Sequence, residues 1–223
     1  PAPPIRPIAA MTTLDPEIAE TLIDLGLLRR GDEPEAKPLA GGVSSDIWRV
    51  ALPAGPVCVK RALARLKVAQ EWRAPVERNE YEVGWLRTVG ELVPDAVPRL
   101  IAASHRAHLF VMEYLAPDTH ALWKRQLRDG AIDPATATSV GERLVRIHAA
   151  TAGKSEVAAA FANGAQFRAL RLEPYLLFTA NRHPDLAPAI RDAVDAIGKA
   201  RIALMQGDIS PKNILHGPQC PVF

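Results

Sequence analysis

The decapeptide QGDISPKNIL, residues 206–215, contains two side chains that suit a reaction by type and by spacing. Asp208 supplies a carboxylate, Asn213 follows five residues later with a carboxamide, and Pro211 between them stiffens the backbone. A stiff loop can hold a proton acceptor and a metal-binding amide at a fixed separation, as phosphoryl transfer requires. The alternative is an Asx-turn loop in which both side chains cap backbone groups. Taken alone, the GDxxxxN spacing fits both interpretations.

The composition limits the classes of partner. The 223 residues have room for one large domain or two lobes. A net charge of +2 without a long Lys/Arg block argues against a nucleic-acid partner. No apolar run approaches the roughly 18 residues of a membrane span, so we expect no membrane partner. The two cysteines, Cys58 and Cys220, lack metal-site spacing and form no disulfide framework, which favours the reducing cytoplasm.

The first predicted element of the chain, ahead of the loop at 206–215, is a helix. Proline-rich residues 1–13 are predicted to be a disordered tail. Asp15 followed by Pro16 then predicts a helix start, and an apolar stripe continues to Leu28 before Gly31. We interpret this helix as a packing element.

A glycine- and serine-rich turn separates the next two predicted strands. Gly41 and Gly42 let a backbone approach a ligand closely and direct N–H groups at a phosphate. Ser44 and Ser45 add hydroxyl donors. The alternative is an ordinary hairpin without a ligand.

A lysine ends the following short apolar strand, 57–59. The ammonium of Lys60 can reach phosphates beneath the glycine-rich hairpin, provided that a carboxylate orients it. The predicted helix 75–89 offers three, Glu77, Glu80 and Glu82. Glu82 borders the apolar side, so we favour it over Glu80 as the partner of Lys60.

The middle of the chain predicts two more strands and then helices. Segments 98–103 and 109–115 are predicted strands, and the second breaks at Ala116–Asp118. In a two-lobed nucleotide enzyme this break is a crossover where backbone groups of Glu113 and Leu115 meet the adenine. His148 is predicted to be a packed structural histidine. The charged residues of 168–195 are predicted to lie on solvated helix faces, with the alternative that some of them line a substrate cleft. The predicted helices span 119–128, 133–152, 174–179 and 188–200.

The order of these segments resembles the protein-kinase-like small-molecule phosphotransferases, the group of aminoglycoside phosphotransferase, choline kinase and methylthioribose kinase. LAGGVSSDIWRV is similar to the nucleotide loop of that family, VCVK to its phosphate lysine, and ERNEYEVGWL to its glutamate helix. VMEYL is similar to the hinge and QGDISPKNIL to the catalytic loop. The resemblance covers about residues 35–223.

The resemblance implies ATP and Mg²⁺ as cofactors and a small-molecule hydroxyl as the acceptor. Asp208 would be the catalytic base, Asn213 the magnesium ligand, and Lys60 the phosphate ligand with Glu82 behind it. The nucleotide would also meet Gly41, Gly42, Ser44, Glu113 and Leu115. The implied fold is α+β and two-lobed, with an antiparallel sheet plus helix over 14–115 and an incomplete, mainly helical lobe over 116–223.

Two positions depart from the family pattern. Gln206 stands where the family has a histidine, and glutamine can still hydrogen-bond to the loop. No carboxylate follows Asp208, whereas the family places a second acidic metal ligand on the next strand, so we expect this chain to be a fragment with little activity of its own. The alternatives are a catalytically inactive nucleotide-binding or scaffold module and a plain interaction domain.

Overall fold

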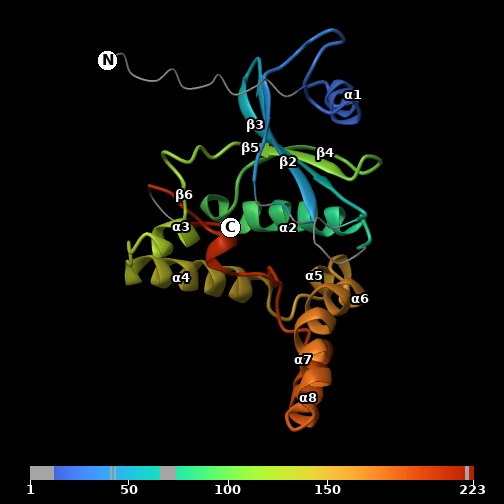
Figure 1. Cartoon of the computed structure of the whole chain (residues 1–223), viewed down its shortest axis with the longest axis vertical. Coiled ribbons are helices and arrows are strands. Elements are labelled where there is room, and N and C mark those ends of the chain that lie inside the picture. Colours follow the sequence, from blue (N-terminus) through green and yellow to red (C-terminus); the bar gives the residue numbers. More distant parts are fainter. Residues whose placement is uncertain (1–12, 41, 43, 66–73, 219–220) are drawn as a thin grey trace, which may run out of the picture.

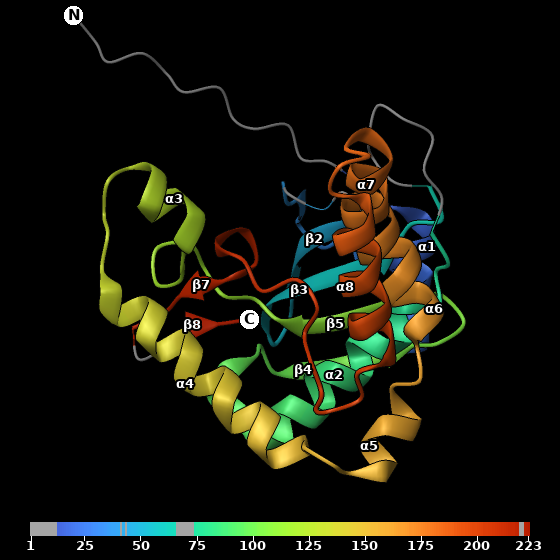
Figure 2. The same ribbon diagram turned by 90° about the horizontal axis from the view of Figure 1, so that it is seen from below.

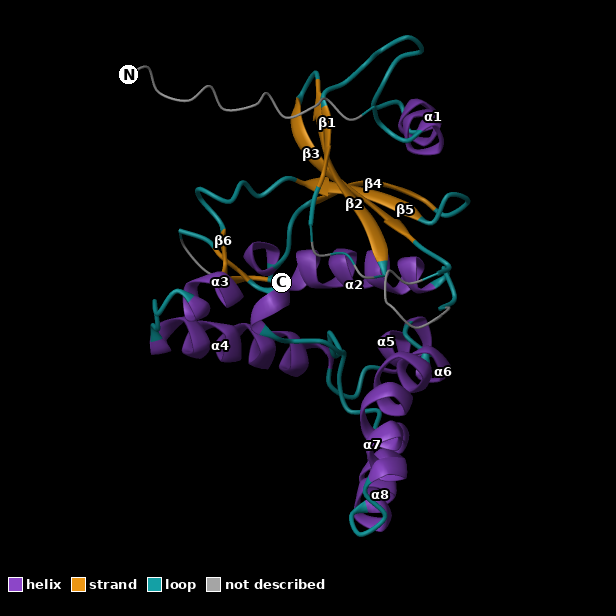
Figure 3. Cartoon of the chain, viewed as in Figure 1, coloured by secondary structure: helices purple, strands orange, loops and turns teal. Residues whose placement is uncertain are grey.

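The computed structural model describes residues 13–40, 42, 44–65, 74–218 and 221–223. Over these residues an antiparallel five-stranded sheet has the order β1-β2-β3-β5-β4, with helices on both sides (Figures 1 and 3). This arrangement confirms the predicted α+β class. The strands of the sheet are β1 Ala36–Pro38, β2 Ser45–Leu52, β3 Gly55–Ala62, β4 Leu100–Ser104 and β5 Leu109–Glu113.

Helices make up most of the remaining described chain. A smaller antiparallel sheet consists of β6 Ala121–Leu122, β7 Leu215–His216 and β8 Pro221–Val222. The longer helices are α1 Pro16–Asp24, α2 Arg78–Leu92, α4 Pro134–Thr151 and α8 Ala187–Lys199. The shorter helical segments are η1 Pro94–Ala96, α3 Trp123–Arg128, α5 Ser155–Ala160, α6 Gly164–Phe167, η2 Arg168–Leu177, α7 Phe178–Arg182 and η3 Pro211–Asn213.

Helix α1 begins as the sequence predicts but ends earlier. The Asp15 carboxylate accepts hydrogen bonds from the backbone N–H groups of Glu17 and Ile18, which caps the first turn. The prediction that the helix continues to Leu28 is wrong. Gly26 has a φ of 72°, in the left-handed region that ends a helix, and the chain leaves the axis there.

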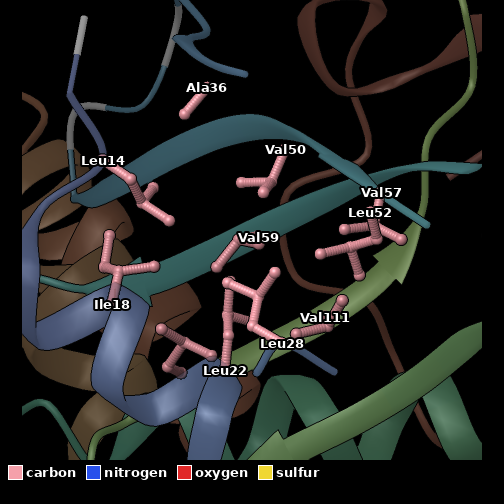
Figure 4. Close-up of a cluster of buried hydrophobic side chains, with 11 residues drawn as sticks. Leu14, Ile18, Leu22, Leu28, Ala36, Val50, Leu52, Val57, Val59 and Val111 are labelled. Carbon is pink, nitrogen blue, oxygen red and sulfur yellow. The ribbon is translucent and has the colours of Figure 1, made fainter. Parts of the chain in front are cut away.

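Two apolar cores lie on opposite faces of the large sheet. In the first, α1 packs on one face of strands β2, β3 and β5 (Figure 4). In the second, α2 covers the other face, where Phe110 of β5 packs in one cluster with Ile147 of α4 and Leu204. Successive residues of a strand point to opposite faces, so Val59 and Val111 join the first core while their neighbours face α2.

The same alternation directs Lys60 toward α2. Val59 is fully buried beneath α1, and Lys60 is the next residue of β3. It is paired in register with Ile47 of β2 and Phe110 of β5. Strand β3 continues two residues past Lys60 to Ala62, so the lysine lies inside the strand rather than at its end.

The second half of the chain departs more from prediction. Helix α4 has nearly its predicted bounds, whereas α3 begins at Trp123 because Ala121 and Leu122 pair with β7. Helices α7 and α8 project from the rest of the molecule (Figure 1), and the view from below looks onto them (Figure 2). His148 is exposed, so its predicted role as a packed histidine is wrong. The tail over 1–12 lies outside the described residues, and the division into lobes at residue 115 stays a prediction.

Candidate functional site

Lys60 and Glu82 form an ion pair between β3 and α2. It is the pairing that the sequence analysis favours. The lysine side chain is 22% exposed and that of Glu82 is 40% exposed. The Lys60 ammonium also lies 5.8 Å from the centre of the Phe110 ring, within the range of a cation–π contact. Its charged end is therefore fixed on two sides and still reaches solvent.

The other candidate carboxylate, Glu80, has a different neighbour. Its Oε1 atom lies 2.8 Å from Nδ1 of His105, in the turn between β4 and β5. Residues two apart on a helix point to different sides, which is why Glu80 and Glu82 do not share a partner.

The glycine–serine turn is fixed largely by its own backbone. Gly41 lies outside the described residues. A Cβ on Gly42 would lie 2.3 Å from the backbone oxygen of Ser45, so the turn itself excludes a side chain at this position. The backbone oxygen of Ser44 accepts from the N–H of Leu63 at 3.0 Å, which connects the turn to the end of β3.

Arg78 at the start of α2 also holds this turn, and the sequence analysis missed it. Its guanidinium donates to the backbone oxygen of Ser44 and, at 2.7 Å, to that of Leu63. Burial lowers the pKa of Arg78, while the negative charges of Glu82 and Glu77 oppose that shift. The residue couples the turn to the helix that holds Glu82. Its sequence signal is weak, because an arginine in a first helical turn normally faces solvent.

The predicted hinge follows β5. The N–H of Glu113 donates to the backbone oxygen of Arg99 at 2.9 Å, so this donor is used within the protein. A ligand at Glu113 would therefore have to bind its backbone oxygen. Leu115 lies in the extended segment after the strand, two residues further along.

Two side-chain hydrogen bonds organise the loop from Gln206 to Asn213. The side-chain oxygen of Gln206 accepts from the N–H of Asp208 at 2.7 Å, so this glutamine supports the loop as expected. The side-chain amide of Asn213 donates to the backbone oxygen of Asp208 at 2.9 Å. Gly207 has a φ of 81°, which a glycine adopts at little cost. Asp208 and Asn213 are thus held in one rigid turn.

Two cations contact the Asp208 carboxylate. The guanidinium of Arg171 lies 3.3 Å from Oδ2, and Nζ of Lys212 lies 3.1 Å from the same atom. Arg171 also donates to the backbone oxygen of Gly207 at 2.9 Å. The sequence favours solvated helix faces for the charged residues of 168–195 and leaves a cleft open as the alternative for some; Arg171 contacts this loop. A separation of 37 residues leaves no sequence signal for the contact.

The donor set of this turn fits a magnesium ion. The hydrogen bond from the Asn213 amide leaves its side-chain oxygen as the atom that can bind a cation. Together with the Asp208 carboxylate it offers oxygen donors, the ligand type that Mg²⁺ prefers. Magnesium sites in phosphotransferases take their remaining ligands from water and from nucleotide phosphates.

Other features of the described residues bear on location and reactivity. None of the described helices is long and apolar enough to cross a bilayer. Cys58 carries a free thiol, and burial raises its pKa to about 11, so it is unreactive. A surface hollow beside α1 contains none of the predicted site residues and is lined by Glu17, Glu20, Thr21, Arg61, Arg106 and Ala107.

Comparison with known proteins gives a distant likeness to solved structures. No family model and no curated protein matches the chain. Among solved structures, the chain is similar to a choline/ethanolamine kinase family protein from Mesorhizobium loti, with 18% sequence identity and a TM-score of 0.49. The match covers 92% of this chain and 63% of the other, so this chain spans less than two thirds of that protein. A likeness of this degree carries no argument about the fold or the function.

Proposed function

We propose that the chain is an ATP-dependent phosphotransferase that transfers the γ-phosphate to a hydroxyl group of a small molecule. The observation that carries the proposal is the Lys60–Glu82 ion pair between β3 and α2. Kinase-type enzymes orient a strand lysine toward the nucleotide phosphates with a helix glutamate. The geometry of the turn at Asp208 and Asn213 supports the same reaction.

Each predicted residue then has a role toward the nucleotide. Lys60 binds the α- and β-phosphates, and Glu82 holds its ammonium in place. The turn with Gly41, Gly42 and Ser44 covers the phosphates, and backbone groups of Glu113 and Leu115 meet the adenine. In this proposal the nucleotide lies between a lobe over 14–115 and a helical lobe that follows it.

The turn at Asp208 supplies the groups for the transfer step. A magnesium ion bound there would neutralise charge on the β- and γ-phosphates, and the side-chain oxygen of Asn213 would hold it. The ion pairs with Arg171 and Lys212 engage Oδ2 of Asp208, so Oδ1 is the atom that would accept the proton of the acceptor hydroxyl. The freed alkoxide oxygen attacks the γ-phosphorus, and ADP leaves.

The acceptor class and compartment are part of the proposal. The sequence resemblance supports a small alcohol, the class that includes the acceptors of aminoglycoside phosphotransferases and choline kinases. The buried free thiol of Cys58 accords with a reducing cytoplasm. We expect the 223-residue chain alone to show little turnover, because the loop offers the metal the Asn213 carboxamide, while its one carboxylate, Asp208, is the proposed base.

The contacts of Asp208 favour a second candidate, a nucleotide-binding module without catalysis. Arg171 and Lys212 both contact the carboxylate that should receive a proton. Two cations at one oxygen make a carboxylate a poorer base. Such a module would bind ATP with Mg²⁺ and would not transfer phosphate.

Calorimetric titration with ATP and Mg²⁺ tests nucleotide binding, which both candidate functions require. Lys60→Ala should weaken binding, whereas Lys37→Ala, which removes an exposed lysine of β1, should not. If the unaltered chain does not bind ATP, both candidates are overturned and a plain interaction domain is favoured.

Turnover of bound ATP separates the two candidates. We would measure ADP formation with small amino alcohols and aminoglycosides as acceptors. If Arg171→Gln raises turnover from a low level and Asp208→Asn abolishes it, the phosphotransferase is supported. ATP binding with no turnover in the chain and in Arg171→Gln would favour the module.

A further inference from the structure

A cluster of three potential metal ligands lies between α2 and the turn that joins β4 to β5. Glu80 comes from the first half of α2, and His105 and His108 are the first and last residues of the turn. One ligand atom of each residue lies within 4.8 Å of the others. None of the roles proposed for the nucleotide site uses these side chains.

Two polar atoms of this cluster are buried without a hydrogen-bond partner among the described residues. They are Oε1 of Glu80 and Nδ1 of His108. Oε1 of Glu80 lies at ion-pair distance, 2.8 Å, from Nδ1 of His105 without a hydrogen bond between them, and a bound cation would replace this contact with two metal bonds. Buried polar atoms are paired in the great majority of cases. A cation bound by both atoms would satisfy them together.

The turn holds its two histidines in a fixed arrangement. The N–H of His108 donates to the backbone oxygen of His105 at 3.2 Å, and the backbone oxygen of His108 accepts from Ala62 at 3.0 Å. The φ of His108 is 45°, a left-handed conformation that is uncommon for residues other than glycine. Arg106, between the two histidines, is paired with Asp24 of α1, which keeps its positive charge engaged elsewhere.

We propose that Glu80, His105 and His108 form a binding site for a divalent transition-metal ion, with Zn²⁺ as the preferred cation. Two imidazoles and one carboxylate are a ligand set that zinc uses with an open fourth position. The side chains of His105 and Glu80 are 78% and 39% exposed, so water has access to that position. The site does not depend on the proposed phosphotransferase activity.

The geometry requires only small side-chain movements. Zinc bonds of about 2.0–2.2 Å place tetrahedral ligand atoms about 3.3 Å apart, so the wider pairs must close by up to about 1.5 Å. The exposed side chains of His105 and Glu80 can make that movement without disturbing the cores. A bound ion would cross-link α2 to the β4–β5 turn and so add to stability.

Isothermal titration of the chelator-treated, full chain with Zn²⁺ tests the site. We expect one tight site per chain, and in His105→Ala and in His108→Asn a loss of affinity of at least about tenfold. Asparagine is chosen at position 108 because it tolerates the left-handed backbone, so that variant should fold. His183→Ala removes an exposed histidine outside the cluster and should bind zinc like the unaltered chain.

Two further measurements identify the ligands. With Zn²⁺ at about 100 times its Kd, the melting temperature should rise by roughly 5–10 °C, and His108→Asn should abolish the rise. Co²⁺ in the same site should give the intense visible absorption of a four-coordinate ion. Equal Zn²⁺ affinity in the unaltered chain and both cluster variants would overturn the proposal. A cobalt–thiolate band in the near ultraviolet would also overturn it, because cysteine would then be the ligand.

Discussion

Replacing Glu82 with glutamine should weaken ATP binding through Lys60. The substitution keeps the size of the side chain and removes its charge, so the Lys60 ammonium loses the group that orients it. Lys60 would remain on the α2 face of β3, near the Phe110 ring, because the strand register fixes its backbone. The lysine would then sample more rotamers and meet the phosphates less often.

The exposure of the Lys60–Glu82 ion pair determines how much free energy its loss should cost. Exposed ion pairs contribute about 0.2–1 kcal/mol, and hydrogen bonds to charged groups about 1.5–3 kcal/mol. With side chains 22% and 40% exposed, Lys60 and Glu82 lie between these cases. We therefore expect Glu82→Gln to lower stability by about 1 kcal/mol, or the melting temperature by about 2–4 °C. The affinity for ATP should fall about 5- to 30-fold, the equivalent of about 1–2 kcal/mol.

The assay is calorimetric titration with ATP and Mg²⁺ for the unaltered chain, Glu82→Gln and a matched control. Glu91→Gln serves as the control, because Glu91 is an exposed glutamate near the other end of the same helix. A double-mutant cycle with Lys60→Ala measures the coupling directly. Equal affinities in Glu82→Gln and Glu91→Gln, or additive effects in the cycle, would refute the reasoning.

Three further predictions concern the surrounding structure. Arg78→Lys should increase hydrogen exchange at the N–H of Leu63 and weaken ATP binding several-fold. Nη2 of Arg78 donates to the oxygens of both Ser44 and Leu63, and lysine lacks the second nitrogen, Nη1, that anchors the guanidinium to the backbone oxygens of Ala74 and Pro75. Ile18→Ala should destabilise the α1 core by about 2–5 kcal/mol in urea unfolding, and the control Ile202→Ala, 75% exposed, should have little effect. Burial raises the pKa of Asp15, but hydrogen bonding and charge from Arg61 and the N–H groups of the first helical turn bring it below the ordinary value of 3.8. In acid the unfolded chain therefore binds more protons than the folded chain. The stabilisation from Asp15 is complete above its ordinary pKa and is lost as the pH falls through the lower pKa of the folded state. In urea unfolding at acidic pH, Asp15→Asn should reduce this loss of stability.

Much of the fold follows from local sequence. Asp15 before Pro16 determines where α1 begins, since capping and proline geometry depend on adjacent residues. Asp133 before Pro134 starts α4 in the same way. The end of α1 before Gly26 was missed although glycine is a local stop signal, because the apolar stripe runs past it. The pairing of Ala121 and Leu122 with β7 was missed because strand partners depend on distant packing.

Some features of the candidate site also follow from local sequence, and others depend on tertiary packing. The sequence alone determined the types and order of the groups: a glycine–serine turn, Lys60, Glu82, and a loop with Asp208 and Asn213. It also favoured Glu82 over Glu80, because the apolar face of a helix can be read from its own residues.

Apart from the Lys60–Glu82 pair, only the tertiary structure decided which polar groups meet. Arg171 reaches Asp208, Arg78 reaches Ser44, and Glu80 joins His105 and His108, across separations that no local pattern encodes. The reason is physical: periodicity tells which face of an element is buried, whereas ion pairs and metal ligands depend on which elements the cores bring together. The sequence thus determined the chemical groups of this protein, and the packing of α2 and η2 determined their partners.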